Sequence, residues 1–448
     1  MSILYTGNTV IGRLFEYFSA YFGSTTRPTK VLLTWLLIAM LALEGMPSIR
    51  QLYRHFLSRV YPKSLNCYYR ACAVAELDSN VFLTTTVRLA LGLIPDTLKN
   101  EPVFLSTDDT IIVKFGKHFE HISVLHDHAR HNGKLYVNGH DFVSLNFCVP
   151  VMTNCQGKDC ISYVSIPLGY KLWTKADNKL EMAADMVSAV MPLMADRQVI
   201  LSFDSWYAKK RFIRPLQGFD NLTMICNARY DSALFDLPPA PTGKRGRPAK
   251  RGKKLSLDDF TPDYEYDGFK IAHRRVLTNI FGDKPVHAYV TESASGSRRL
   301  FFCTAEPSTI HMDCSRQEKA SLRDVASNDV EYFPIRLYGM RWNIEVGYYE
   351  QKMFWDLSRY MIRSKTGIER VLNLVNIAHG AMKILPYHYD CWQDFQKHSP
   401  QELRFAISEQ IRKQVFLTTL SETAKTIGKS SGFLNTLIRL VEKFGLAT

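Results

Sequence analysis

The chain has 448 residues, nine cysteines and a formal net charge of +13. This length suffices for about three domains, and the positive charge favours a polyanionic partner such as a nucleic acid. The cysteines are scattered, odd in number and without a C-x-x-C pair, which argues against a disulfide framework and favours a reducing, intracellular compartment.

The N-terminal sequence gives no sign of secretion or membrane insertion. Residues 1–30 lack the apolar core of a signal peptide. The apolar run Val31–Leu43 is thirteen residues long, which is too short to cross a bilayer, and it predicts a buried helix instead. We therefore expect an intracellular protein, cytoplasmic or in the nucleoid, without membrane contact.

Residues 1–100 have helical patterning. Ser48 can cap one short helix, and Ser64, which follows Pro62, can cap a second that runs to about residue 77. Basic side chains surround both helices: Arg50, Arg54, Arg59, Lys63 and Arg70. The pair is consistent with a helix-turn-helix that reads DNA, and a plain helical bundle explains the same pattern.

From residue 101 the pattern changes to apolar, strand-like runs. The predicted strands and helices are, in chain order, Val103–Val113 (interrupted by the polar Ser106–Thr110), Phe142–Met152, Ile161–Leu168, the helix Asp177–Met194, Gln198–Phe203, the helix Ser205–Leu216 and Leu222–Cys226. This order is that of an α/β, RNase H-like domain, in which the first and fourth strands are neighbours. A carboxylate of the first strand, at Asp108 or Asp109, would then approach Asp204 at the end of the fourth.

The segment 229–329 exceeds what such a domain needs, and it contains further β-rich pieces. Within it, Gly243–Lys254 has seven Lys or Arg in twelve residues, including Lys244, Arg245, Arg247, Lys250 and Arg251. Its Arg-Gly-Arg-Pro core is similar to an AT-hook, which lies in the minor groove of DNA. A solvated basic loop without a partner explains the same composition.

Six of the thirteen histidines fall between His118 and His140. A zinc site needs about four ligands, and no cysteine lies nearby in sequence, so this segment is a poor candidate for a metal site. A loop that contacts phosphate between the first two strands and an ordinary solvated hairpin are the two remaining interpretations.

The most informative stretch is Tyr338–Lys352, which reads YGMRWNIEVGYYEQK. On a helix with ~100° per residue, one face within an arc of about 60° carries Tyr338, Arg341, Glu345 and Lys352. The apolar side chains that would dock this helix on a core are Trp342, Ile344, Val346 and Met353. A carboxylate among cations on a rigid helix is suited to holding a metal ion against a phosphodiester. An exposed helix with an ordinary Arg341–Glu345 ion pair is the alternative.

The spacing Tyr, two residues, Arg, three residues, Glu, six residues, Lys is that of the DDE transposases of the insertion sequence four family. The chain resembles this family over roughly residues 101–370. The resemblance implies an RNase H-like catalytic core with a β-rich insertion domain and helical N- and C-terminal regions. The implied division is 1–100 (helical, with DNA binding open), 101–228 (first part of the core), 229–329 (insertion with the AT-hook-like loop), 330–385 (catalytic helix and end of the core) and 386–448 (helical).

The resemblance also implies the site. Asp109, Asp204 and Glu345 would be the catalytic carboxylates and would hold Mg²⁺, with two ions expected and Mn²⁺ able to substitute. Asp109 is preferred to Asp108 because the family favours the aspartate directly before threonine. Tyr338, Arg341 and Lys352 would contact the double-stranded DNA near the cut.

The implied activity is metal-dependent cleavage of transposon-end DNA followed by strand transfer into target DNA, carried out by a homodimer on the DNA. Two alternatives stay open. One is a DNA-binding protein of the same fold that is catalytically inactive or captured for another role, and the other is a metal-dependent nuclease without end specificity.

Overall fold

The structure is a computed structural model that describes residues 8–43, 45, 48–78, 80–127, 133–240, 249–323 and 327–427. The chain divides into two compact units. The first consists of Met1–Val81, His118–Glu120 and Glu350–Thr448, and the second consists of Phe82–Lys117 and His121–Tyr349. The five-part division made from the sequence stays a prediction.

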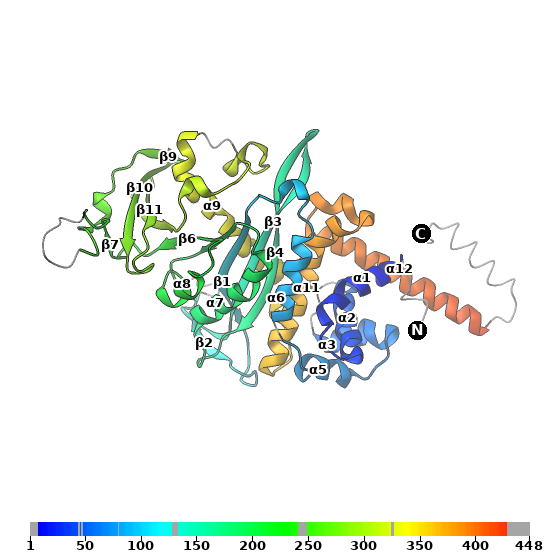
Figure 1. Ribbon diagram of the computed structural model, residues 1–448. Helices are drawn as coiled ribbons and strands as arrows, with labels where there is room; N and C mark the ends of the chain where they lie inside the picture. Colours follow the sequence, from blue (N-terminus) through cyan, green and yellow to red (C-terminus); the bar gives the residue numbers. More distant parts are fainter. Residues whose placement is uncertain are drawn as a thin grey trace. The chain divides into compact units, whose positions relative to one another are not determined.

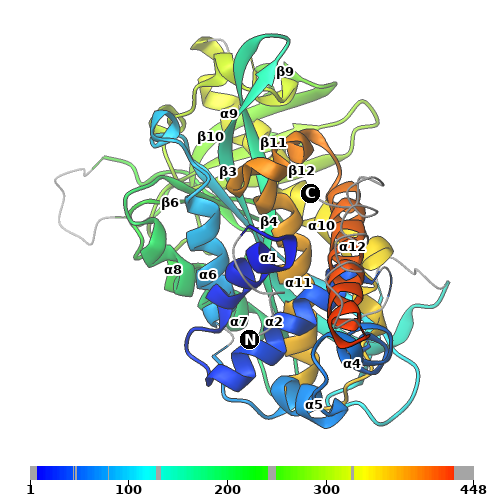
Figure 2. The same cartoon turned by 90° about the vertical axis from the view of Figure 1, so that its right-hand side faces the viewer.

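The first unit is helical. Its described α-helices are α1 (Val10–Ser19), α2 (Arg27–Ala42), α3 (Ile49–Leu52), α4 (Ser58–Val60), α5 (Leu65–Ala73), α11 (Lys365–His388) and α12 (Pro400–Ile427). The apolar run that begins at Val31 lies in α2, whose residues 33–42 are buried, so the predicted buried helix is confirmed. Helix α2 packs against α5, α11 and α12 (Figure 2).

The predicted pair of short helices is present in this unit. The first consists of α3, a π-helical turn Tyr53–Leu57 and α4, and the second is α5. Ser48 and Ser64 stand at the two N-cap positions, but neither side chain makes a capping hydrogen bond. DNA reading by this pair stays a prediction.

The second unit contains every described strand, all in one mixed sheet (Figure 1). The order is β2-β3-β1-β5-β6-β12-β11-β10-β7-β8, with β4 beside β3 and β9 beside β10. The bounds are β1 (Val103–Val113), β2 (Ser123–His126), β3 (Tyr136–Cys155), β4 (Lys158–Leu172), β5 (Val199–Phe203), β6 (Leu222–Ala228), β7 (Leu234–Phe235), β8 (Lys254–Leu255), β9 (Tyr264–Tyr266), β10 (Phe269–Thr278), β11 (Val286–Glu292) and β12 (Arg298–Cys303). The unit is therefore mixed α/β.

Strand β1 carries Asp108 and Asp109, two of the acidic residues considered in the sequence analysis. It pairs antiparallel with β3 and parallel with β5, and β5 pairs parallel with β6. The first and fourth predicted strands are thus neighbours, as expected. The polar segment Ser106–Thr110 does not interrupt β1, because each of its residues has a ladder partner on β3. The backbone is satisfied by the sheet whatever the side chains.

Helices cover this part of the sheet. Helix α7 (Lys179–Val190) packs on β3 and on α8 (Lys210–Leu216), and α9 (Phe333–Tyr338) packs on β6. The helix predicted to begin at Ser205 starts only at Lys210, because Ser205 lies in a turn. The strands of segment 229–329 extend the same sheet, since β12 pairs with β6.

Among the described helices, none has both the length and the apolar character required to cross a membrane.

Candidate active site

The register of β1 against β5 decides which acidic side chains meet. The two strands are parallel, and Ser106 lies beside Ser202. Two residues further on, Asp108 comes level with Asp204, which directly follows β5. Equivalent positions of neighbouring strands point to the same face, whereas successive residues alternate. Asp108 therefore shares a face with Asp204, and Asp109 points to the opposite face.

On the Asp108 face, Arg341 bridges two carboxylates. Its Nη1 lies 3.2 Å from Asp108 Oδ2, and its Nη2 donates a short hydrogen bond to Glu345 Oε1. Arg341 ends the 3-10 turn Gly339–Arg341, which contacts both β1 and β5. Glu345 lies in the first turn of α10 (Trp342–Phe354). The bridge therefore ties the start of α10 to the strand that carries Asp108.

Tyr348 fixes α10 one turn after Glu345. Its hydroxyl shares a hydrogen bond with Ser144 Oγ, which also donates to the carbonyl oxygen of Asp108 at 3.4 Å. Ser144 is the β3 partner of Asp108 in the ladder. Because residues three apart lie on one side of a helix, this contact holds Glu345 toward Asp108.

The charges on this face are poorly balanced. Burial, and then the negative charges of Asp204 and Asp109, raise the pKa of Asp108 to about 7, although Arg341 acts in the other direction. Burial also raises the pKa of Asp204, even though the N–H groups of Trp206 and Tyr207 donate to its Oδ1 at 3.0 and 3.3 Å. One guanidinium thus pairs with Asp108 and Glu345 and also attracts Asp204, while Asp108 and Asp204 repel each other.

Asp109 belongs to a second cluster, on the other face of β1. Lys179 Nζ lies 2.7 Å from Asp109 Oδ2 and makes a shorter ion pair with Asp141 Oδ2. The Tyr207 hydroxyl donates to Asp109 Oδ1 at 3.4 Å. Burial and the charge of Asp109 raise the pKa of Asp141, whose Oδ1 has no hydrogen-bond partner. Asp109 is held by Lys179, not by Arg341.

Of the three carboxylates predicted to be catalytic, the structure brings Asp204 and Glu345 to the face of Arg341 and leaves Asp109 on the other face. Asp108 takes its place beside them. Within the described ranges, no three His, Cys, Asp or Glu side chains converge closely enough to hold a metal ion. The donor atoms are nevertheless of the type that Mg²⁺ prefers, carboxylate oxygens, and a divalent cation would relieve the repulsion between Asp108 and Asp204.

The other residues predicted to contact DNA from the same helix face, Tyr338 and Lys352, have different surroundings. Tyr338 is half-buried and packs edge-to-face on Phe301, with ring centroids 5.0 Å apart, and the Arg341 guanidinium lies 5.9 Å from the Tyr338 ring. Lys352 is half-buried in α10, seven residues after Glu345. DNA contact by these residues stays a prediction.

The predicted continuous helix and its docking face are both wrong in part. A 3-10 turn separates α9, which ends at Tyr338, from α10. Of the four apolar residues expected to dock α10, Ile344 is buried, whereas Trp342 and Met353 are each 61% exposed and Val346 is 39% exposed. Hydrophobic character alone did not identify the buried face of α10. Polar contacts also hold this helix, such as the hydrogen bond between Tyr348 and Ser144.

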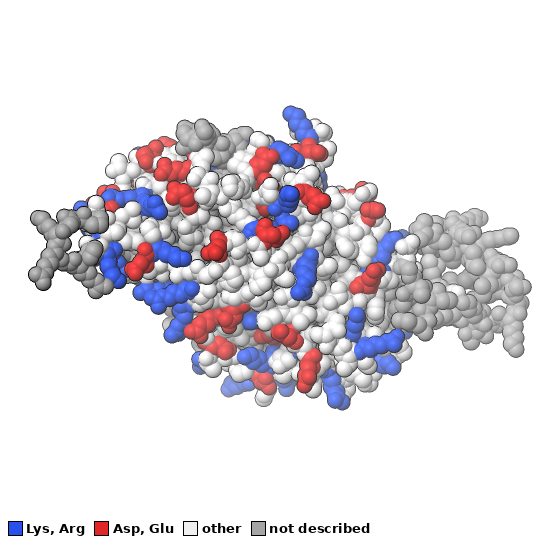
Figure 3. Space-filling model, in the orientation of Figure 1, with Lys and Arg blue, Asp and Glu red and all other residues white. Residues whose placement is uncertain are grey.

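The basic run of the insertion lies mostly outside the described residues. Lys244, Arg245 and Arg247 fall within 241–248, which the structure does not describe. Lys250 is exposed. Arg251 donates to Asn279 Oδ1 at 2.6 Å, and its guanidinium lies 4.7 Å from the Phe235 ring. Arg251 is thus bound to the protein itself. On the face drawn in Figure 3, Lys and Arg side chains alternate with Asp and Glu, without one continuous basic patch.

Sequence reasoning missed Lys179 and Asp141. Asp141 lies within the buried run Gly139–Val151 of β3, which is mostly apolar, and Lys179 follows the N-cap Asn178 of α7. A charged residue inside an apolar strand is a usable signal, because a buried carboxylate needs a partner. The identity of that partner is not encoded locally, since Lys179 is 38 residues away in the sequence.

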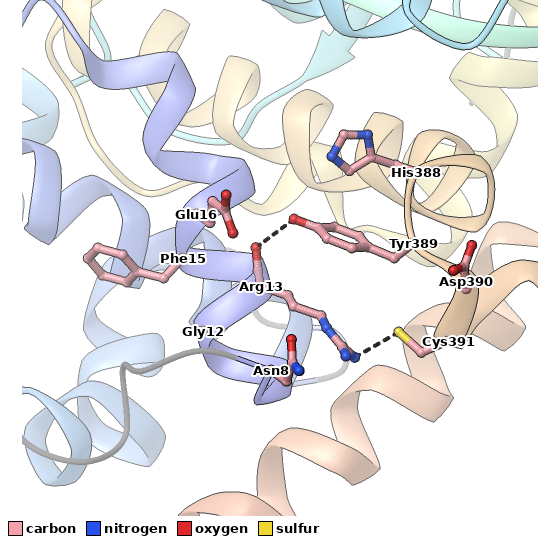
Figure 4. Close-up of a pocket in the computed structure, with 9 residues that line it drawn as sticks. All are labelled: Asn8, Gly12, Arg13, Phe15, Glu16, His388, Tyr389, Asp390 and Cys391. Atoms are coloured by element: carbon pink, nitrogen blue, oxygen red, sulfur yellow. Dashed lines mark hydrogen bonds between the residues drawn. The ribbon is translucent and has the colours of Figure 1, made fainter.

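A cavity of about 510 Å³ lies in the helical unit (Figure 4). Arg13 Nη1 donates to Cys391 Sγ at 2.9 Å, and the Tyr389 hydroxyl donates to the Arg13 carbonyl oxygen at 3.3 Å. The carboxylates of Glu16 and Asp390 also line it. None of the predicted site residues lines the cavity, so it adds nothing to the candidate site.

The predicted role of the histidine-rich segment His118–His140 stays untested, and His128 and His131 lie outside the described residues.

No protein-family model matches the chain, and no curated protein matches it in sequence. Among solved structures, a cryo-electron microscopy structure of a piggyBac transposase synaptic complex with hairpin DNA aligns with 97% of this chain and 83% of that chain. The identity is 12% and the TM-score is 0.41.

Proposed function

We propose that the chain is a DDE-type transposase of the insertion sequence four kind, with an RNase H-like core. It would cut transposon-end DNA in a metal-dependent reaction and join the ends to target DNA. The observation that carries the proposal is the parallel pairing of β1 with β5. This pairing brings Asp108, in the middle of β1, and Asp204, which follows the end of β5, to one face. Arg341, directly before α10, and Glu345, in its first turn, lie on that face, and the strand order agrees with that core.

We assign the metal-binding set as Asp108, Asp204 and Glu345, with Asp108 in the role that the family resemblance predicted for Asp109. Their oxygens are hard donors suited to Mg²⁺. When bound, the divalent ions would activate the attacking oxygen and stabilise the leaving one. The DNA phosphates near the cut would be bound by Arg341, Tyr338 and Lys352, which share the helix motif with Glu345.

The partners follow from this assignment. The substrate would be double-stranded DNA, first at the transposon ends and then at the target, and two ends would be bridged by a homodimer. The basic run around Lys250 would add phosphate or minor-groove contacts. The net charge of +13 agrees with a polyanionic partner.

A cleavage assay on DNA from both sides of the coding region tests the proposal. Duplexes with the flanking sequences and scrambled duplexes of equal length are incubated with the full chain and Mg²⁺ or Mn²⁺. Cleavage and joining confined to the flanking ends would support a transposase. Equal cleavage of both duplexes would indicate a nuclease without end specificity, and binding without cleavage would indicate an inactive DNA-binding protein.

A further inference from the structure

The orientation of the Asp204 carboxylate depends on the two residues that follow Ser205. Asp204 Oδ1 accepts hydrogen bonds from the backbone N–H groups of Trp206 and Tyr207, at 3.0 and 3.3 Å. In such a turn an aspartate side chain is bound to the backbone just after it. Whatever holds Trp206 and Tyr207 in place therefore also sets the direction of the Asp204 carboxylate.

Both residues contact the Lys179 cluster, which consists of Lys179, Asp109 and Asp141. The Trp206 ring lies 5.3 Å from Lys179 Nζ, within the range of a cation–π interaction. The buried Tyr207 donates its hydroxyl hydrogen to Asp109 Oδ1 at 3.4 Å. Lys179 Nζ in turn lies 2.7 Å from Asp109 Oδ2. Lys179 thus reaches Trp206 directly and Tyr207 through Asp109.

Lys179 is itself fixed from several sides. Its side chain is 15% exposed and makes an ion pair with Asp141, which is 3% exposed. Its Nζ also lies 5.5 Å from the Trp173 ring. The backbone of Lys179 begins α7 directly after the N-cap Asn178. A side chain confined by ion pairs and packing in this way is suited to supporting the residues of a site.

We propose that Lys179 is a positioning residue for Asp204, which it orients through Trp206 and through the hydrogen bond between Asp109 and Tyr207. This inference rests on the proposed function, because Asp204 belongs to the carboxylates assigned there to DNA cleavage. Lys179 acts only through the turn Asp204–Tyr207. Its loss therefore slows cleavage and leaves the affinity for DNA unchanged.

The first test needs no DNA. Amide hydrogen exchange measures local opening of the backbone, and the N–H groups of Trp206 and Tyr207 are the ones that bind Asp204. In Lys179→Gln, a peptide that contains both residues should exchange at least about tenfold faster than in the wild type. A peptide from β11, in the same unit, is the reference and should exchange at the wild-type rate. Equal exchange of both peptides in folded Lys179→Gln overturns the inference.

The second test is cleavage of the flanking-end duplex at saturating DNA. The saturating rate of Lys179→Gln should be about 10- to 100-fold below that of the wild type, because a small displacement of a reacting group has effects of this size. The Kd for the duplex should stay within about twofold. Lys179→Arg keeps the charge and can stack on Trp206, and it should recover to within about fivefold of the wild-type rate. A purely structural role predicts a less stable Lys179→Gln with the wild-type saturating rate once folded.

Arg298→Gln is the matched control. Arg298 lies 2.6 Å from both Glu292 and Asp258, so this change also removes a cation that bridges two carboxylates in the same unit. Its cleavage rate and its exchange at Trp206 should equal those of the wild type. Trp206→Leu serves if Lys179→Gln does not fold, because it keeps the ion pairs of Lys179 and removes a ring that is 38% exposed. Its saturating rate should fall about three- to tenfold.

The outcomes separate this inference from the proposed function. If the wild type cleaves the flanking ends and folded Lys179→Gln cleaves them within about twofold of the wild-type saturating rate, the inference is wrong and the proposed function stands. If Lys179→Gln does not fold, the same result with Trp206→Leu overturns the inference. If the wild type cleaves no duplex, the proposed function fails, and the role of Lys179 in cleavage fails with it.

Discussion

Helix α10 contributes acidic residues to two clusters that differ in charge balance. In the first, Asp108, Asp204 and Glu345 have Arg341 as their common cation. In the second, Glu350 accepts from His379 Nε2 at 2.9 Å and pairs with Lys383 Nζ at 2.7 Å. Gln351 Nε2 donates to His379 Nδ1 at 3.0 Å, which completes that network.

The pKa values reflect the difference. Burial acts to raise the pKa of both Asp108 and Glu350. At Asp108 the neighbouring carboxylates raise the pKa further than burial alone, to about 7. At Glu350 the contacts from His379 and Lys383 outweigh the effect of burial and lower the pKa to about 2. A carboxylate with its own donors stabilises the fold, whereas carboxylates that share one cation retain the capacity to bind another.

The largest expected effect separates the clusters by activity. Asp108→Asn and Glu345→Gln should each reduce cleavage of end DNA by at least about a thousandfold, because each removes a ligand from the site that stabilises charge in the transition state. The free energy of unfolding of Asp108→Asn should stay equal to the wild-type value or increase, since repulsion from Asp204 is relieved. Glu345→Gln loses its ion pair with Arg341 and should be less stable by no more than about 1 kcal/mol. Cleavage assays and urea titrations measure the two quantities. A destabilised Asp108→Asn variant with wild-type cleavage would reverse the assignment.

Asp109→Asn tests whether the two adjacent aspartates of β1 have different roles. Asp109 is paired with Lys179 on the opposite face of β1, so we expect cleavage to fall by no more than about tenfold, as for residues that act through others. Stability should decrease, because Lys179 keeps only Asp141 as its partner. The measurement is the same cleavage assay run beside Asp108→Asn. A complete loss of cleavage in Asp109→Asn alone would restore the carboxylate set first predicted from the sequence.

Acid should weaken the second cluster. Burial lowers the pKa of His379 to about 4, from an ordinary value near 6.5. The unfolded chain therefore binds this proton at a higher pH than the folded chain does, and stability is lost as the pH falls below about 6.5. Between pH 7 and 4.5 the loss should be about 2.5 kcal/mol.

Urea unfolding of the wild type and of His379→Gln at both pH values isolates this contribution. The variant should show a smaller decrease in the free energy of unfolding than the wild type over this range. Glu350 makes its own contribution only below about pH 4.5. Parallel decreases in both proteins would show that His379 is not the group responsible.

The smallest expected effect is that of Tyr338→Phe. The ring contacts with Phe301 and Arg341 are kept, and only the hydroxyl is lost. We expect stability to change by less than about 1 kcal/mol and end cleavage by only a few-fold, far less than for Glu345→Gln. If the two variants were equally impaired, the phenol would belong with the reacting groups.

Much of the arrangement was predictable from the amino-acid sequence alone. Apolar runs located β3, β4, β5 and β6 and the buried helix α2, and the order of elements predicted that β1 and β5 are neighbours. Asp204 at a strand end and the Arg341–Glu345 spacing on a helix were also readable. These features depend on local patterns of hydrophobicity and on residue spacing, which survive without knowledge of the fold.

Only the tertiary structure distinguished Asp108 from Asp109. The two are adjacent, and a strand directs adjacent side chains to opposite faces, so the register Ser106–Ser202 decides which one meets Asp204. The same holds for the pairing of Lys179 with Asp141 and for the exposure of Trp342 on α10. Each depends on contacts between segments far apart in the chain, and local sequence does not specify which face of an element such contacts will cover.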